Sequence, residues 1–232
     1  METLITLVTY SHTDYQDVWP IVLGQLKKQT MPFSRIFACN ETDVDLSAVR
    51  NIYTDVVFYK DTLLYPQKIL SILEQVTTPY ILFVHDIDVF VTFETEKFAV
   101  LLNSILKYSI DRCMLGMVSR QGDVLGNGEV VLTNVSMPNR SPSYVTPYDV
   151  GPSIWSISCM KEAMKIVHQE TYRTIEQSAI QQFLTSKKVY ALTSSPAYHS
   201  VYQIGRPFSS YFSFLFYLLM HKFRIMLNGI FL

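Results

Sequence analysis

The chain has 232 residues, which suits one α/β domain of ordinary size with a substantial core. Its formal net charge at pH 7 is -1, and its lysines and arginines are scattered. Nothing in this pattern marks the basic footprint of a protein that binds nucleic acid, so we expect no nucleic-acid partner. The three cysteines are odd in number and widely spaced, which argues against a disulfide framework and a zinc cluster. We expect Cys39, Cys113 and Cys159 to be small core residues.

The first predicted element is a buried strand at residues 4–9, which lacks the basic region and cleavage site of a secretory signal. We therefore expect the chain to begin in the cytosol. A polar turn follows, and then Val18, Ile21, Val22 and Leu26 have the spacing of a helix. Strand character returns at residues 35–39 and ends in polar residues 40–43. The order strand, helix, strand predicts a βαβ unit.

A second helix is predicted to begin at Pro66, since apolar residues recur after it at helical spacing and Thr77, Thr78 and Pro79 end it. The apolar run at residues 80–91 that follows has the composition of a strand, and it carries Asp86 and Asp88. Aspartate is disfavoured in strands and costly to bury without a partner. A divalent cation that holds a phosphate would offset this cost. The alternative is a strand end whose two carboxylates face water or cap the next turn.

The α/β alternation continues with a helix around residues 98–106 and a strand at 113–118. Glycine and proline then break regular structure between residues 122 and 152, where we expect a long irregular loop and one short hairpin around residues 126–128. Beyond the loop, the pattern predicts a strand at 154–157, helices at 161–168 and 174–187, and a strand at 189–192.

The βαβ start, the polar loops after the first two strands and the D-x-D that ends an internal strand resemble the GT-A class of nucleotide-sugar glycosyltransferases. The resemblance covers residues 4 to about 200. It implies an α/β, GT-A-like and Rossmann-like fold, with a mixed sheet flanked by helices in a domain of residues 1–205. It also implies that two loops hold the nucleoside. These loops carry Thr9, Tyr10 and Ser11 after the first strand, and Asn40 and Asp43 after the second.

The same resemblance assigns the metal site. Asp86 approaches the ribose or the metal, and Asp88 binds a Mn²⁺ or Mg²⁺ ion that bridges the two phosphates of the donor. His199 occupies the place of a third metal ligand, although a lone histidine is also common as a packed or merely polar residue. Lys68 lies where relatives place a polar residue near the donor, and its alternative role is that of a solvated helix lysine.

A general base is needed to deprotonate the acceptor hydroxyl in inverting members. Glu176 takes this place by resemblance, although it is followed by Gln177 where relatives often have a second acid. A helix N-terminal acid that favours the macrodipole is the alternative role of Glu176. Asp149 is the second candidate base, and its alternative role is that of a turn aspartate.

Two aromatic residues are candidates for stacking on the acceptor, Tyr148 and Trp155, with burial in the core as the alternative for the tryptophan. The last segment, residues 206–232, is apolar and aromatic, with Lys222 and Arg224 interrupting it. Its first apolar run is too short to span a bilayer. We expect a helical extension that lies in a membrane interface or packs against protein.

These observations predict a metal-dependent glycosyltransferase that moves a sugar from a nucleotide-diphosphate sugar to a hydroxyl of a glycan or lipid-linked acceptor. We expect it in the cytoplasm, and on the cytoplasmic face of a membrane if the last segment binds lipid. The alternatives are a phosphohydrolase of the haloacid dehalogenase type, whose signature also contains D-x-D after an apolar strand, and a non-catalytic sugar- or nucleotide-binding module.

Overall fold

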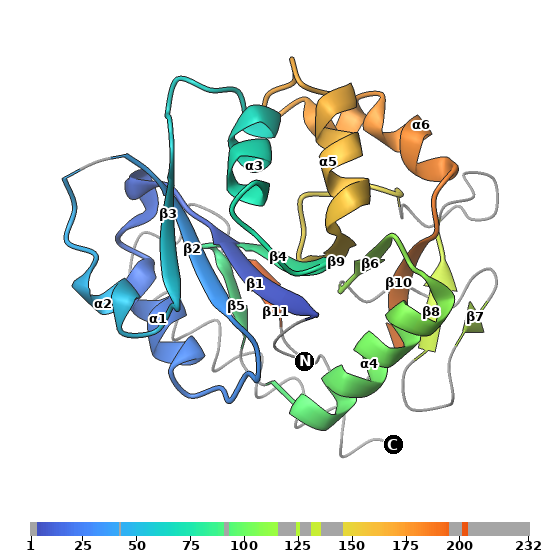
Figure 1. The fold of residues 1–232 in the computed structure, drawn as a ribbon, viewed down its shortest axis with the longest axis horizontal. Helices are drawn as coiled ribbons and strands as arrows, with labels where there is room; N and C mark the ends of the chain where they lie inside the picture. The colour runs from blue at the N-terminus through green and yellow to red at the C-terminus, as the bar shows by residue number, and fades with distance from the viewer. Residues whose placement is uncertain are drawn as a thin grey trace, which may run out of the picture.

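The computed structural model describes residues 4–41, 43–90, 93–115, 124–125, 131–135, 146–194 and 201–203. These residues build a mixed sheet of nine strands with helices on both faces, and a separate sheet of two strands (Figure 1). The predicted α/β class with a mixed sheet flanked by helices is therefore confirmed.

The first half of the sheet is parallel. Its strands are β1 (Ile5–Tyr10), β2 (Arg35–Asn40), β3 (Asp55–Tyr59) and β4 (Tyr80–His85). The connections carry η1 (Thr13–Tyr15), α1 (Trp19–Leu26), α2 (Ser47–Arg50) and α3 (Tyr65–Leu73). β1 pairs with β2 on one side and with β4 on the other, which confirms the βαβ unit. The strand order thus reverses at β1, and in open α/β sheets ligands bind outside the carboxyl ends of the strands at such a point.

The second half of the sheet mixes parallel and antiparallel pairs. Its elements are α4 (Thr95–Tyr108), β6 (Arg112–Met114), β7 (Val124–Leu125), β8 (Val131–Asn134), β9 (Ser153–Ser156), α5 (Ile157–Ile166), η2 (Ile175–Gln177), α6 (Ile180–Thr185) and β10 (Val189–Ser194). β9 is antiparallel to both β4 and β6 and joins the two halves. The full order is β3-β2-β1-β4-β9-β6-β10-β8-β7. β7 and β8 pair antiparallel on either side of the segment in which the hairpin was predicted.

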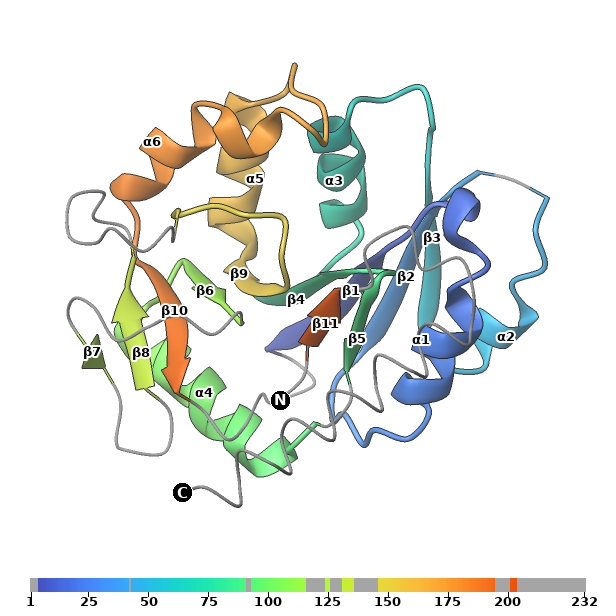
Figure 2. The same ribbon diagram turned by 180° about the vertical axis from the view of Figure 1, so that it is seen from behind.

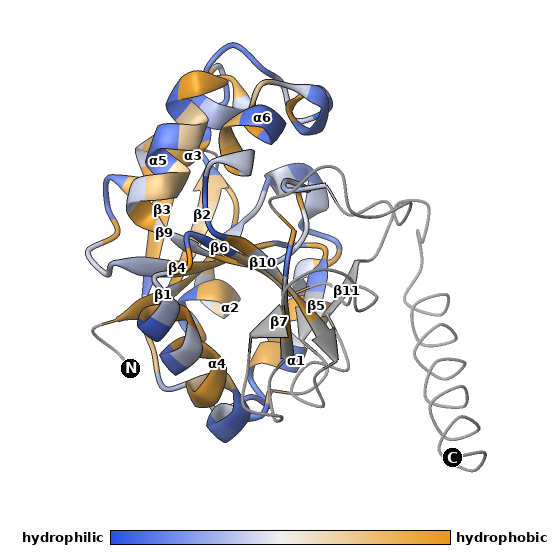
Figure 3. Ribbon diagram, turned by 90° about the vertical axis from the view of Figure 1, so that its right-hand side faces the viewer, coloured by the Kyte–Doolittle hydropathy of each residue, from blue (hydrophilic) through white to orange (hydrophobic). Residues whose placement is uncertain are grey.

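Each face of the sheet has its own apolar core, because successive side chains of a strand point to opposite faces. Ile5 and Leu7 of β1 pack with α1, α2 and α4 on one face. Val8 of the same strand packs on the other face with α3, α5 and α6. Figure 3 shows the sheet between these two layers of helices. All three cysteines are buried and unpaired in these cores, as predicted.

The apolar run at residues 80–91 differs from the prediction, because it is not one strand. β4 ends at His85, a turn carries Asp86, and β5 (Asp88–Phe90) leaves the main sheet to pair with β11 (Val201–Gln203), beside which it lies in Figure 2. The turn sets the two carboxylates into different surroundings. A single strand would have pointed both to one face.

Three further boundaries differ from the prediction. The helix predicted at 174–187 is broken into η2 and α6 by Ser178, whose hydroxyl donates to the Ile175 carbonyl and accepts from the Ile180 N–H. α5 begins earlier than residue 161, since the Ser156 side chain caps it by accepting from the Cys159 N–H. β3 and α2 were not predicted, although residues 56–59 of β3 have the β-branched and aromatic composition of a strand.

The predicted C-terminal extension, residues 206–232, lies outside the described residues. Within the described part of the chain, no helix has the length and apolar character needed to cross a membrane.

Candidate functional site

A cleft of about 400 Å³ opens at the carboxyl ends of β1 and β4, where the strand order reverses. Its walls come from the loop after β1, the segment from residue 63 to the first turns of α3, the turn after β4, and residues 171 and 172. Among the predicted site residues, Tyr10, Lys68 and Asp86 line it. Aromatic and histidine side chains form much of the remaining surface. The cleft has the size and mixed lining that small-molecule sites usually have.

Asp86 joins the two strands that flank the switch point. Its Oδ2 accepts hydrogen bonds from Ser11 Oγ at 2.5 Å, from the His12 N–H at 3.3 Å and from Trp19 Nε1 at 3.4 Å. Burial to 5% exposure raises the pKa of Asp86 to about 6, although these hydrogen bonds oppose the shift. Asp86 therefore anchors the loop after β1 to the turn after β4.

Asp88 is buried more deeply, at 1% exposure, and has fewer partners. Its Oδ2 accepts from the His85 N–H at 2.8 Å, whereas its Oδ1 has no hydrogen-bond partner in the part of the chain that the structure describes. Burial raises the pKa of Asp88 to about 8, and the charges of Asp86 and Asp149 add to the shift. An orphaned buried carboxylate oxygen beside two other carboxylates is a position that a cation would stabilise.

The residue before this pair, His85, is fully enclosed and neutral. Burial lowers the pKa of His85 to about 4. Its Nε2 lies 3.2 Å from the hydroxyl of Tyr65, and its ring contacts Tyr172 at a centroid distance of 5.6 Å. His85 therefore supports the cleft wall without adding a charge to it at pH 7.

The residues around Asp88 fit a hard cation only if the substrate supplies further ligands. Over the described ranges, no group of three or more His, Cys, Asp and Glu side chains is arranged to hold a metal. His199, the predicted third ligand, lies outside the described residues. Mg²⁺ and Mn²⁺ commonly use one or two carboxylates together with substrate phosphates and water, which Asp88 and its orphaned oxygen would allow.

A charged cluster formed by Asp61, Lys68 and His12 was not predicted from the sequence. Asp61, after β3, accepts from Lys68 Nζ at 2.7 Å, and His12 Nε2 lies 3.1 Å from both Asp61 oxygens. His12 Nδ1 accepts from the Asp14 N–H at 3.1 Å, so the ring proton lies on Nε2 when the ring is neutral. The hydrogen bond from Lys68 lowers the pKa of Asp61. Asp61 was missed because β3 was missed.

Not all of the predicted nucleoside residues reach the cleft. Thr9 is buried and its Oγ1 accepts from the Tyr53 hydroxyl at 2.8 Å, so its side chain does not line the cleft. Asn40 instead holds the loop after β1, since its amide bonds the N–H and hydroxyl of Thr13 at 2.9 and 3.1 Å. Asp43 is exposed and does not line the cleft. Ser11 is buried and acts through Asp86.

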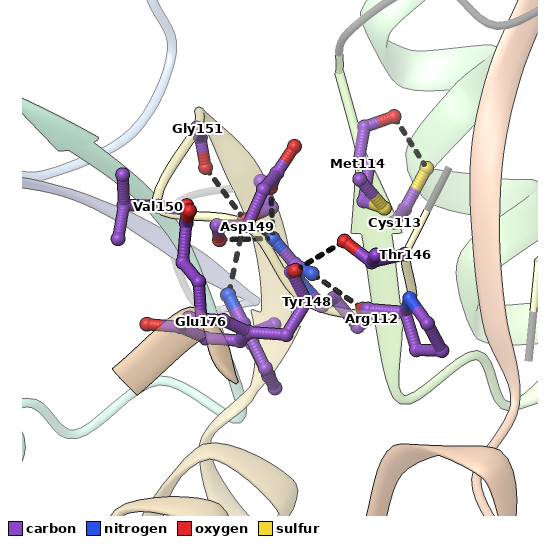
Figure 4. A network of polar contacts seen from close by, with 12 residues as sticks. Arg112, Cys113, Met114, Thr146, Tyr148, Asp149, Val150, Gly151 and Glu176 are labelled. Atoms are coloured by element: carbon purple, nitrogen blue, oxygen red, sulfur yellow. Dashed lines mark hydrogen bonds and ion pairs between the residues drawn. The ribbon is translucent and has the colours of Figure 1, made fainter. Parts of the chain in front are cut away.

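A buried arginine organises the loop before β9 (Figure 4). Arg112 of β6 is fully buried and donates to the Pro147 carbonyl at 2.5 Å, and to the Asp149 carbonyl and Oδ1 at 2.9 and 2.7 Å. It also donates to Ser153 Oγ at 3.1 Å. The Asp149 side chain remains 44% exposed. The loop thus presents a carboxylate that the protein itself has paired with a cation.

Glu176 of η2 ties the same loop from the other side. Its Oε1 accepts from the Val150 N–H at 2.7 Å, and Gln181 holds the N–H of Tyr148 at 3.0 Å. Glu176 is otherwise exposed, and no lysine or arginine of the described chain forms an ion pair with it. Both predicted candidate bases are therefore joined through residues 148–150, and neither lines the cleft.

The two residues predicted to stack on the acceptor do not form an exposed platform in this structure. Tyr148 and Trp155 are both buried, and the Arg112 guanidinium lies over their rings at 5.0 and 4.7 Å. Rings enclosed in this way have no face available to a sugar. The alternative stated for Trp155, burial in the core, is the correct one.

The sequence matches no protein-family model, and a search of curated proteins finds no match. Solved structures do match. S. aureus TarS 1-349 in complex with UDP-GlcNAc has a TM-score of 0.53 at 16% identity, over 84% of this chain and 57% of that one. A 4-diphosphocytidyl-2C-methyl-D-erythritol synthase has a TM-score of 0.55 at 11% identity, over 93% and 98% of the two chains. CMP:2-keto-3-deoxy-manno-octonic acid synthetase with CTP has a TM-score of 0.54 at 10% identity, over 97% and 99%.

The fold is GT-A-like. At these identities the likenesses concern the architecture of the sheet and its helices, and they confirm the fold class that the sequence predicted. The chain spans between 36% and 61% of the length of the TarS chains that it matches. What it binds or transfers is therefore argued from its own cleft.

Proposed function

We propose that this protein is a metal-dependent glycosyltransferase that takes a sugar from a nucleotide-diphosphate donor and passes it to an acceptor hydroxyl. The observation that carries the proposal is Asp88, a buried carboxylate with an orphaned oxygen at the switch point of the sheet. TarS, which shares the fold, has been crystallised with UDP-GlcNAc and with UDP, which supports a nucleotide sugar as the ligand of this cleft.

Each residue of the candidate site has a separate role in this proposal. Mn²⁺ or Mg²⁺ on Asp88 would neutralise the charge that develops on the leaving diphosphate. Asp86 keeps the loop after β1 in place next to Tyr10. Tyr10 and Lys68 of α3 face the nucleotide. Lys68 Nζ is held by Asp61, which fixes its position before the donor binds. Because water is excluded from buried Asp88, its interaction with a cation is stronger than at a surface.

We assign the general base to Glu176 and keep Asp149 as the second candidate. Arg112 already neutralises Asp149 through a bond of 2.7 Å, whereas Glu176 receives only the Val150 N–H in the interactions described above. A carboxylate without a cationic partner is the better proton acceptor. Glu176→Gln preserves the acceptor for Val150 and should lower the transfer rate by about 10²- to 10⁴-fold with donor binding retained. Asp149→Asn is the matched comparison, and a larger loss in that variant would reverse the assignment.

Donor hydrolysis tests the proposed function directly. The protein is incubated with Mn²⁺ and a panel of UDP-, GDP- and dTDP-sugars, and release of the nucleotide diphosphate is measured. We expect release from at least one donor, and a loss of about a thousandfold or more in Asp88→Asn. Asp17→Asn, an exposed change outside the cleft, is the matched control. No release from any donor, or equal release by Asp88→Asn, would contradict the proposal, and binding without release would favour the non-catalytic module.

Nucleotidyl transfer is the second candidate, because the two synthases match this chain over nearly their whole lengths. A triphosphate carries more negative charge than a diphosphate ester and needs cations or backbone N–H groups to hold it. The loop after β1 carries Ser11, His12, Thr13, Asp14 and Tyr15, with no lysine, arginine or glycine. We therefore rank this reaction second. Pyrophosphate release from CTP in the presence of 2-keto-3-deoxy-manno-octonic acid would favour it over sugar transfer.

The haloacid dehalogenase-type alternative needs a carboxylate that can attack phosphorus. Asp86 Oδ2 is held by three donors and Asp88 is almost fully buried. Neither carboxylate is presented as a nucleophile, which ranks phosphate hydrolysis below both transfers.

A further inference from the structure

The cleft contains one aromatic side chain whose surroundings differ from those of the others. Tyr65 is buried, Tyr15 is half-buried, and Tyr10 has one face covered by Tyr59, which stacks on it at 5.2 Å and 9°. Tyr172 lines the same cleft and remains 41% exposed. Small-molecule sites are lined largely by apolar and aromatic side chains, so an exposed ring in the cleft is a surface that a ligand can cover.

Two neighbours hold the ring of Tyr172 in place. It meets Tyr65 at a centroid distance of 5.2 Å and an angle of 79°, and His85 at 5.6 Å and 75°. His85 is joined to Tyr65 by the contact between its Nε2 and the tyrosine hydroxyl. These near-perpendicular contacts use part of the ring surface and leave the remainder to the cleft, directly beside the turn that carries Asp86.

The backbone that carries Tyr172 is fixed as well. The Thr171 N–H donates to Thr174 Oγ1 at 3.0 Å, and the Ile175 N–H donates to the Thr171 carbonyl at 3.1 Å. Gln67 of α3 donates to the His168 carbonyl at 3.3 Å and ties the loop to the opposite wall. A ring held by such bonds before binding loses little conformational entropy when a ligand arrives.

Negative charge near Tyr172 affects its phenol. Burial raises its pKa to about 12, and the charges of Asp88, Glu176 and Asp86 add to this shift. The phenol therefore stays protonated at neutral pH, and it is able to donate a hydrogen bond.

We propose that Tyr172 forms the sugar subsite of the cleft, with its exposed ring against the C–H face of the donor's pyranose and its hydroxyl donating to a sugar hydroxyl. A pyranose has an apolar C–H face and a rim of hydroxyls, and a tyrosine offers a matching apolar body with a polar end. The inference rests on the proposed function and adds to it the residue that recognises the sugar. No pattern in the sequence marks Tyr172, which follows a helix in a polar stretch.

The test compares a nucleotide sugar with its nucleotide. Dissociation constants for UDP-GlcNAc and UDP, and for any donor that the hydrolysis panel selects with its own nucleotide diphosphate, are measured by titration calorimetry with Mn²⁺. We expect Tyr172→Ala to weaken the nucleotide sugar about tenfold while the nucleotide diphosphate changes by less than about twofold. Tyr172→Phe keeps the ring and should retain most of the affinity.

Ile166→Ala is the matched control, since Ile166 is a similarly exposed apolar side chain at 45% and lies at the end of α5 outside the cleft. An equal weakening of UDP and UDP-GlcNAc by Tyr172→Ala would overturn the subsite and assign the ring to the nucleotide. Unchanged binding of both, including the case in which only an acceptor is affected, would overturn it as well. If the wild-type protein binds no nucleotide sugar in the panel, the proposed function itself fails, which is a separate result.

Discussion

Asp149 and Asp88 lie close enough for the charge of one to raise the pKa of the other, but the protein surrounds them differently. Asp149 is half exposed and is paired with Arg112, which itself is fully buried against two aromatic rings. Asp88 is almost fully buried, and one of its oxygens has no partner in the described part of the chain. Among the described residues, the protein thus supplies a permanent cation for the first carboxylate and none for the second.

The difference separates a structural position, Asp149, from a position that a cation could stabilise, Asp88. A buried charge without a partner costs several kcal/mol and persists only where something offsets it. The Asp149 carboxylate is stabilised by its ion pair with Arg112, and this ion pair shapes the loop before β9. Asp88 is stable as a protonated acid, or as a carboxylate with a bound cation.

Removal of the internal cation should have the largest effect on the fold. Arg112→Met leaves the carbonyls of Pro147 and Asp149 without their donor, and we expect a loss of about 3 to 5 kcal/mol in the free energy of unfolding. Urea denaturation measures this loss. Arg50→Met, at an exposed helix end, should change the same quantity by less than about 0.5 kcal/mol. Similar values for the two variants would show that the Arg112 network contributes nothing.

The unpaired carboxylate should reveal itself in the pH dependence of stability. The pKa of Asp88 is about 8 in the folded state, against 3.8 for an unperturbed aspartate side chain. The stability that protonated Asp88 contributes is complete below the unfolded pKa and is lost as the pH rises through about 8. Without metal, wild-type stability should therefore fall between pH 5 and pH 8 by about 2 to 4 kcal/mol more than that of Asp88→Asn.

Denaturation series at several pH values, with Asp17→Asn as the control, measure this difference. Asp17 is exposed, so its variant should follow the wild-type curve. Parallel curves for the wild type and Asp88→Asn would mean that Asp88 is compensated by the protein, like Asp149.

A divalent cation should repair the unpaired site. With a saturating nucleotide diphosphate, addition of Mn²⁺ at about 100 times its dissociation constant should stabilise the wild-type protein by about 2.7 kcal/mol. Because the ligand is the carboxylate, the effect should be larger at pH 8 than at pH 6, and it should disappear in Asp88→Asn. Thermal melting curves with and without Mn²⁺ show the shift. A shift that survives in Asp88→Asn would place the cation elsewhere.

The smallest effect is expected at Glu176, which holds the Asp149 loop through a hydrogen bond. Glu176→Gln retains an oxygen for the Val150 N–H and should change stability by less than about 0.5 kcal/mol, whereas Glu176→Ala removes that acceptor and should cost about 1 kcal/mol. Urea denaturation separates the two. An equal loss in both variants would show that the charge of Glu176, and not its hydrogen bond, holds the loop.

Local pattern was enough to predict the α/β alternation. The βαβ start, the helix that became α4 and the hairpin of β7 and β8 followed from apolar spacing and from glycine and proline, which act within a short window of sequence. The place of Asp86 and Asp88 after a buried strand was also clear, since two carboxylates in an apolar run are a local anomaly.

The choice of side chains that face the cleft was not local. Thr9 and Tyr10 are neighbours in β1, yet alternation and strand pairing bury the first and place the second in the cleft. The sequence made Tyr148 and Trp155 candidates for stacking on a ligand. In the structure, the guanidinium of Arg112, more than thirty residues away in the chain, lies over both rings.

The sequence by itself determined the α/β alternation and the position of the D-x-D, because these depend on periodicity and on residue type. Only the tertiary structure decided that Asp149 has a cation while Asp88 has none among the described residues, that Asp61 and His12 meet, and that Tyr172 is the exposed ring of the cleft. Such contacts depend on which strands pair and which loops reach the same edge of the sheet, and residues distant in sequence meet there only after the chain has folded.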